Sequence, residues 1–192
     1  VLQSATLFRG GTMAERFENG YAGHVAVVTG GGTGMGREMV RQLTAQGCDV
    51  ATCDVIVDNL AETVDICTKD GNPGAILTHM ADVSDETQVL SFRDAVATWR
   101  PHVNVVFNNA GIGGGGSIME SDRTEWEKTF GVCWYGVYYN TRAFLPLLLK
   151  APFGHVVNTS SVNGFWASLG PNTAHTAYSA AKFAVKGFTE AL

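Results

Sequence analysis

Tyr178 and Lys182 are four residues apart in the segment 177–182, a spacing that permits acid–base chemistry. On a helix, this spacing puts both side chains on one face, one turn apart. An ammonium group beside a phenol favours the phenolate, because an opposite charge stabilises the ionised state. The pair is therefore a candidate general acid/base at neutral pH. Taken alone the pattern is weak, since a chance pair on a solvated helix face gives the same spacing.

A glycine-rich segment at 29–36 lies between an apolar run and a helical pattern. Glycines let the backbone come close to a diphosphate, whose charge is favoured by the N-terminus of the following helix. The spacing is Gly-x-x-x-Gly-x-Gly rather than the usual Gly-x-Gly-x-x-Gly, and a simple glycine turn is the alternative. We expect phosphate binding here, with cofactor contacts from Gly30, Thr33, Gly34, Met35 and Gly36.

Two acidic residues follow strand-like segments. Asp54 lies 18 residues after Gly36, where a carboxylate can accept hydrogen bonds from the adenosine ribose and repel a 2′-phosphate. No Lys or Arg follows at 55–57, so the sequence favours NAD over NADP. Asp82, followed by Val83, could contact the adenine. Alternatively, Asp82 or Ser84 caps the next helix.

Alternating strands and helices must position these residues. We expect strands at 24–29, 49–54, 75–79, 103–107 and 155–159, and helices at 37–46, 59–69, 85–99, 123–150 and around 178–182. This alternation predicts a parallel sheet with helices on both faces. In such sheets ligands bind beyond the carboxyl ends of the strands. The glycine segment, Asp54, Asp82, the run 108–111 and the serines at 160–161 all fall at those ends.

Composition indicates one globular domain. The 192 residues are 45% hydrophobic and 16% charged, which suits a packed core. The net charge is −5 and Lys and Arg form no run, so we expect no nucleic-acid partner. Residues 1–12 have no periodic pattern and are expected to be a tag or disordered leader, with Met13 as a possible native start. The single domain is predicted to span 13–192.

The cysteines and the apolar runs indicate a cytoplasmic protein. Cys48, Cys53, Cys67 and Cys133 are scattered without metal-ligand spacing, so we predict free thiols and no metal site. The longest apolar stretches have the length of strands, so no membrane span is expected.

With these residues in hand, the chain closely resembles the short-chain dehydrogenase/reductase family from about His24 to Leu192. The resemblance rests on Thr-Gly-x-x-x-Gly-x-Gly at 29–36, Asn-Asn-Ala-Gly at 108–111, a serine after the fifth strand, and Tyr-x-x-x-Lys at 178–182. It implies a Rossmann-like, doubly wound domain that interconverts a secondary alcohol and a carbonyl with NAD. The family usually forms dimers or tetramers through its long helices, so we expect a homodimer or homotetramer.

The resemblance also implies residue roles. Tyr178 would exchange a proton with the substrate oxygen and also contact the cofactor, and Lys182 would bind the nicotinamide ribose and hold Tyr178 near its ionised form. Ser161 would donate a hydrogen bond to the substrate oxygen, with Ser160 as the alternative. The residues implied to lie along the cofactor are Asn109, Ala110 and Gly111, and Asn109 would also steady the central strands.

Three departures from the family pattern qualify this reading. Cys133, three residues before Gly136, stands where many members have an asparagine that helps hold a water in a proton relay, and a thiol is a poorer hydrogen-bonding anchor. The segment 162–177 is longer than usual, and its Phe165 and Trp166 either line an apolar pocket or pack over a sheet edge. The chain stops inside a predicted helix, so we expect the C-terminal part of the domain to be truncated.

Two other functions were weighed. A non-catalytic nucleotide sensor or assembly protein of the same fold is the principal alternative, and a methyltransferase leaves Tyr178 and Lys182 without a role. The helix at 123–150 is more apolar than one sheet face requires, which favours a subunit interface. Many alcohols and ketones share this framework, so the sequence does not identify the substrate.

Overall fold

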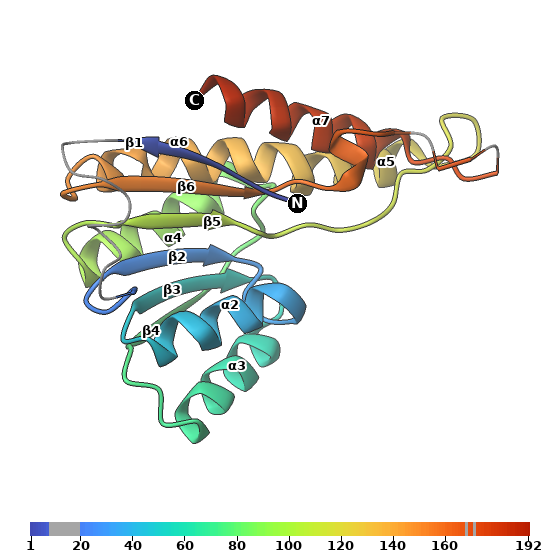
Figure 1. The fold of residues 1–192 in the computed structure, drawn as a ribbon. Helices are drawn as coiled ribbons and strands as arrows, with labels where there is room; N and C mark the ends of the chain where they lie inside the picture. The colour runs from blue at the N-terminus through green and yellow to red at the C-terminus, as the bar shows by residue number, and fades with distance from the viewer. Residues whose placement is uncertain (8–19, 168, 171) are drawn as a thin grey trace.

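A six-stranded sheet organises the chain (Figure 1). The computed structural model describes residues 1–7, 20–167, 169–170 and 172–192. The strands lie in the order β1-β6-β5-β2-β3-β4. Their bounds are β1 (Leu2–Leu7), β2 (Val25–Thr29), β3 (Asp49–Asp54), β4 (Ile76–Met80), β5 (Val105–Asn108) and β6 (Gly154–Thr159). Strands β2 to β6 are parallel, as predicted, and β1 runs antiparallel to β6, so the sheet is mixed.

The edge strand β1 was not predicted. Leu2 pairs with Thr159 and Leu7 with Gly154, so a segment expected to lie outside the fold belongs to the sheet. The disordered alternative is therefore wrong for residues 2–7. The physical reason is that an edge strand such as β6 exposes a row of backbone donors and acceptors, which an extended segment of almost any sequence can pair. Residues 8–12 and Met13 lie outside the described residues, and the tag interpretation stays a prediction.

Helices cover both faces of the sheet, as the alternation predicted (Figure 1). Ala26 and Val28 of β2 pack with α2 (Gly34–Ala45) and α3 (Val57–Lys69). Val25 and Val27 point the other way and pack with α4 (Glu86–Trp99) and α6 (Gly136–Leu148). The helix α7 (Thr176–Ala191) also lies on this second face. Asn158 of β6, which points to the same side as the buried Val156 two residues before it, donates from Nδ2 to Thr189 of α7.

The predicted long helix at 123–150 consists of three helical segments. These are α5 (Arg123–Phe130), a π-helix η1 (Gly131–Tyr135) and α6. Gly136, at the start of α6, lies so close to β4's following loop that a Cβ there would sit 2.7 Å from Cγ2 of Val83. A π-turn adds one residue to a helical turn and often occurs at functional sites. Here it contains Cys133, which is completely buried.

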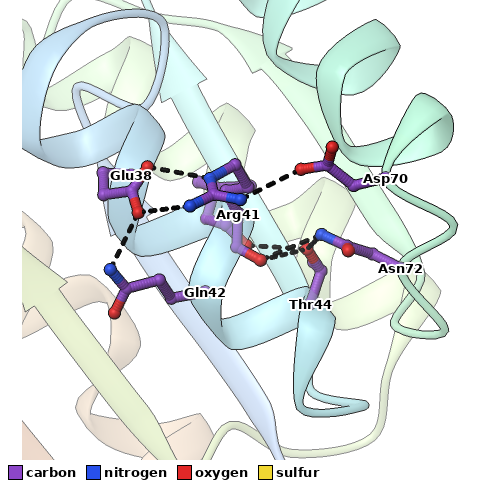
Figure 2. Close-up of polar contacts among 7 residues, drawn as sticks. Glu38, Arg41, Gln42, Thr44, Asp70 and Asn72 are labelled. Atoms are coloured by element: carbon purple, nitrogen blue, oxygen red, sulfur yellow. Dashed lines mark hydrogen bonds and ion pairs between the residues drawn. The ribbon is translucent and has the colours of Figure 1, made fainter.

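A polar network joins α2 to the end of α3 (Figure 2). Arg41 forms ion pairs with Glu38 at 2.8 Å and with Asp70 at 3.1 Å. Asn72 donates from Nδ2 to the carbonyl oxygen of Arg41 and to Oγ1 of Thr44, both at 2.9 Å. The loop after α3 is thereby fixed against α2. Among the described residues, no helix is both long and apolar enough to cross a membrane.

Candidate active site

The glycine loop, residues 30–36, turns from β2 into α2 at the carboxyl edge of the sheet. Gly30 has a φ of +70°, and a Cβ there would lie 2.9 Å from Cα of Ala110. A Cβ at Gly36 would overlap the carbonyl oxygen of Gly30. Both positions therefore require glycine, one for its backbone conformation and both for close approach.

The N-terminus of α2 is open to an anion. Thr33 occupies the N-cap but makes no side-chain capping bond, and the first turn contains no acidic residue. The first N–H groups of a helix have no partner within it and carry partial positive charge. A diphosphate placed there would accept hydrogen bonds from these groups. The helix starts at Gly34, earlier than the predicted 37, because the glycine motif itself forms its first turn.

Asp54 lies beside this loop. Its Oδ2 accepts a hydrogen bond from the N–H of Gly32 at 3.0 Å, and its Oδ1 accepts one from Ile56 at 3.1 Å. Each carboxylate oxygen has two lone pairs, so the fixed group can still accept from ribose hydroxyls.

Asp82 makes a turn rather than a helix cap. Its Oδ1 accepts hydrogen bonds from the N–H and the hydroxyl of Ser84, at 2.9 and 2.7 Å. Asp85 caps α4 instead, accepting from the N–H of Thr87 at 2.8 Å. The alternative that Asp82 or Ser84 caps the helix is therefore wrong, because α4 begins at Glu86, one residue later than predicted, and Asp85 occupies its N-cap.

One pocket of about 490 Å³ gathers these features, a volume typical of ligand sites. Except for Tyr178 and Lys182, every predicted cofactor residue lines it: Gly30, Thr33, Gly34, Met35, Gly36, Asp54, Asp82, Val83, Asn109, Ala110 and Gly111. The pocket also includes residues that the sequence did not indicate, among them Ile56 and Asn59 near the start of α3, Lys128 of α5 and Val132 of the π-helix. Ile56 follows Asp54 closely and could have been inferred from it. Lys128 and Val132 come from a distant helix, and no sequence signal marks them.

Asn109 links the two central strands where they end. Its Nδ2 donates to the carbonyl oxygen of Thr29 at 3.0 Å. The hydroxyl oxygen of Thr29 in turn accepts the N–H groups of Asn109 and Ala110, both at 3.0 Å. These bonds hold the segment after β5 against the start of the glycine loop, in agreement with the steadying role that the resemblance implied.

Tyr178 and Lys182 lie together on α7. The Nζ atom of Lys182 is 5.5 Å from the centroid of the Tyr178 ring. Lys182 is only 2% exposed and donates from Nζ to the carbonyl oxygen of Thr159 at 2.7 Å. Burial lowers the pKa of Lys182, and the nearby Cys133 acts in the opposite direction. A buried ammonium beside a half-buried tyrosine is not the chance surface pair that the spacing alone allowed.

The structure separates the two candidate serines. Ser160 is buried and its hydroxyl donates to the carbonyl oxygen of Lys182 at 3.3 Å. Ser161 is half-buried and caps the short 3-10 helix η2 (Val162–Gly164), accepting the N–H of Asn163 at 3.2 Å. The Ser160 hydroxyl is thus bonded to α7, whereas the Ser161 hydroxyl is bonded within η2, where it also reaches Oδ1 of Asn163 at 3.4 Å, and neither serine lines the pocket described above.

Cys133 and Lys182 both lie close to Gly111. A Cβ on Gly111 would lie 3.7 Å from Nζ of Lys182 and 3.8 Å from Sγ of Cys133. The thiol donates to the carbonyl oxygen of Ile112 at 3.2 Å, so it is bonded to the segment after β5. Cys133 is therefore a neighbour of the Lys182 ammonium, as its position in the sequence suggested.

Two further residues near Tyr178 were not anticipated. Asn163 donates from Nδ2 to the hydroxyl of Ser179 at 3.4 Å, which connects η2 to the helix that carries Tyr178. The ring of His175 packs edge-on at 5.9 Å from the ring of Tyr178. Phe165 and Trp166 are exposed, and neither lines the pocket described above.

Comparison with known proteins identifies the family of this chain. The family model described as short chain dehydrogenase matches residues 24–192. The chain belongs to this family. The protein SadH of Mycobacterium tuberculosis is 40% identical over 172 residues, which cover 90% of this chain and 60% of SadH. The chain thus spans about 60% of the length of that curated relative.

Solved structures of other short-chain dehydrogenases share the fold. One from Burkholderia phymatum, in complex with NAD, is 37% identical with a TM-score of 0.80, covering 89% of this chain and 59% of its own. A metagenomic short-chain oxidoreductase in complex with NADP is 30% identical with a TM-score of 0.80, covering 89% of this chain and 75% of its own. The predicted family and the Rossmann-like fold are confirmed, and the site lies where a nicotinamide dinucleotide binds in such folds.

Proposed function

We propose that this chain forms the cofactor-binding and acid–base part of an NAD-dependent oxidoreductase that interconverts a secondary alcohol and a carbonyl compound. The observation that carries the proposal is the buried Lys182 ammonium beside Tyr178, at the edge of the sheet where the glycine loop and Asp54 border an open pocket. The residues present fit a dinucleotide, because Gly30 and Gly36 leave room for close backbone approach and the N-terminus of α2 is uncapped.

The chemistry divides between the cofactor and the chain. When bound, NAD supplies the hydride acceptor. Tyr178 accepts the hydroxyl proton of the alcohol, with the Nζ atom of Lys182 5.5 Å from the centroid of its ring. Ser161 donates a hydrogen bond to the substrate oxygen. Holding the alcohol between these groups and the cofactor contributes by positioning the reactants.

NAD is the proposed cofactor because Asp54 presents a fixed carboxylate at the side of the glycine loop. A 2′-phosphate on the ribose would be repelled there. Similar proteins have been solved with NAD and with NADP, so the preference rests on Asp54 alone. The four free buried thiols accord with a cytoplasmic protein, which we also propose.

Replacement of Tyr178 by Phe tests the acid–base role. The variant keeps the ring and its packing against His175 but lacks the hydroxyl that carries the proton. We expect kcat for oxidation of a panel of secondary alcohols to fall by about 10²- to 10⁴-fold, measured by NADH formation. NADH affinity should change far less than kcat, because the ring and its packing are kept. Wild-type turnover by Tyr178→Phe would contradict the proposed proton route, and NADH binding by the wild type without turnover would favour a nucleotide sensor.

A further inference from the structure

Three side chains outside the predicted site hold the glycine loop from the side of α3. Arg37 of α2 and Thr63 of α3 contact the carbonyl groups of Gly31 and Gly32, and Glu62 pairs with Arg37. We call Arg37, Glu62 and Thr63 the loop clamp. None of the three lines the pocket, so they would act on a ligand only through the loop.

Thr63 is completely buried behind the loop. Its hydroxyl is 2.9 Å from the carbonyl oxygen of Gly31, 3.0 Å from that of Asn59 and 3.3 Å from that of Gly32. A hydroxyl has one hydrogen, so it donates to one of these oxygens at a time, with Gly31 the nearest.

Arg37 holds the next carbonyl group. Its Nε and Nη2 both donate to the carbonyl oxygen of Gly32, and Nε also reaches Oγ1 of Thr63 at 3.1 Å. The guanidinium group can do this because its donors are coplanar and fixed in direction. Glu62 pairs with Nη2 from the solvent side, where its own side chain is 60% exposed.

Peptide geometry carries the effect of these bonds to the ligand side of the loop. In a trans peptide, the carbonyl of one residue and the N–H of the next point in opposite directions. Fixing the Gly31 carbonyl therefore fixes the N–H of Gly32, which donates to Oδ2 of Asp54 at 3.0 Å. Fixing the Gly32 carbonyl likewise directs the N–H of Thr33 away from the clamp, and Thr33 lines the pocket.

The N–H groups of the loop are held from the other direction by β3. Gly30 and Gly31 donate to the carbonyl oxygen of Cys53 at 2.8 and 3.1 Å. Carbonyl and amide groups of the loop are thus both bonded before any ligand arrives. A loop fixed in this way loses little conformational entropy when it binds.

We propose that the loop clamp sets the dinucleotide affinity of the chain by holding the glycine loop and Asp54 in their binding arrangement. This inference rests on the proposed function, in that the pocket must bind a nicotinamide dinucleotide. Arg37, Glu62 and Thr63 are positioning residues.

The test compares matched variants by calorimetric titration with NADH. Thr63→Val keeps the size of the side chain but removes the hydroxyl, whereas Thr63→Ser keeps the hydroxyl. Arg37→Met removes the donors to Gly32, whereas Arg41→Met removes an arginine one turn along α2 whose ion pairs with Glu38 and Asp70 do not involve the loop. We expect Kd to rise about 3- to 10-fold in Thr63→Val and in Arg37→Met, and to change less than about 2-fold in both controls.

Hydrogen exchange without cofactor supplies a second measurement. Amides at 31–36 should exchange faster in Thr63→Val and Arg37→Met than in the control variants, because the loop opens more often. If the wild type binds NADH and all variants bind it equally, the loop clamp is refuted and the proposed function stands. If the wild type binds neither NADH nor NADPH, the proposed function fails and the affinity role of the clamp fails with it. Arg37 is partly exposed, so Arg37→Met keeps the test decisive if Thr63→Val does not fold.

Discussion

Lys182 combines a charge with almost complete burial, which is costly unless the group is bonded. Within the described part of the chain, its Nζ atom donates a hydrogen bond to the carbonyl oxygen of Thr159. The amine is therefore held at the end of β6 by the backbone rather than by a carboxylate. This bond keeps the amine beside the ring of Tyr178, 5.5 Å from its centroid, where the proposed acid–base role needs it.

The lowered pKa of Lys182 predicts how stability depends on pH. Burial lowers this pKa, so between the lowered value and about 10.4 the unfolded chain binds a proton that the folded chain does not. The stability of the wild type should therefore rise with pH in this window, relative to Lys182→Met, which cannot titrate there. Thermal unfolding of both proteins from about pH 7 to 10.4 measures this. A constant difference in Tm would show that burial does not shift the Lys182 equilibrium.

Asp54 should control the choice between NAD and NADP. In Asp54→Ser the charge that repels a 2′-phosphate is gone, so the ratio of NADPH to NADH affinity should rise about tenfold. The control is Asp58→Ser, which removes an exposed carboxylate from the first turn of α3 that does not line the pocket. Binding titrations with both cofactors give the ratios. An unchanged ratio in Asp54→Ser would remove the basis for NAD preference.

At the scale of the elements, the sequence predicted what periodicity and parallel topology determine. The strands that end at Thr29, Asp54 and Asn108 were predicted within two residues of their observed bounds. Their carboxyl ends lie at one edge of the sheet, so the residues that follow them were correctly predicted to line one pocket. The π-helix around Cys133 was missed, because the apolar pattern of one π-turn does not differ from that of the α-helical turns on either side of it.

The loop clamp and the strand β1 were missed for related reasons. Thr63 looks like an ordinary residue of an amphipathic helix, and only the packing of α3 beside the glycine loop gives its hydroxyl a role. The segment Leu2–Leu7 has no pattern that distinguishes it from a leader, and its pairing with β6 is set by backbone bonds that any sequence can make.

The network between α2 and α3 predicts a stability difference between two kinds of bond (Figure 2). Asn72→Ala removes the donors to the carbonyl oxygen of Arg41 and to the buried hydroxyl of Thr44, and should lower the free energy of unfolding by about 1–2 kcal/mol. Glu38→Gln weakens an ion pair whose side chains are 46% and 41% exposed, and should lower the free energy of unfolding by less than Asn72→Ala does. Urea denaturation measures both. Equal losses would show that burial does not distinguish these contacts.

At the scale of the whole molecule, part of the apolar surface that suggested an interface is used within the chain. Val137, Phe144, Leu147 and Leu148 are buried on the inner side of α6. Other aromatic rings of this region pack against α7. The ring of Trp134 lies edge-on to the ring of Phe188, with 5.5 Å between their centroids. Figure 1 shows α6 and α7 side by side, and the ring of Tyr138 in α6 also packs edge-on against Phe188 at 6.5 Å. We call the rings of Trp134, Tyr135, Tyr138, Tyr139 and Phe188 the aromatic strip.

We propose that this strip joins two or more copies of the chain. Tyr135 stacks on Tyr139 at 5.6 Å and is still 43% exposed, so a second copy could bury it. In a symmetric dimer the strip would meet its own copy, and Tyr135→Glu would bring like charges into an apolar contact. We expect light scattering to give a dimer or tetramer for the wild type and a shift toward monomer for this variant. Val57→Glu, at an exposed position on the other face of the sheet, should leave the mass unchanged. A wild type that is monomeric at every concentration would refute the interface, and equal masses for wild type and Tyr135→Glu would place it elsewhere.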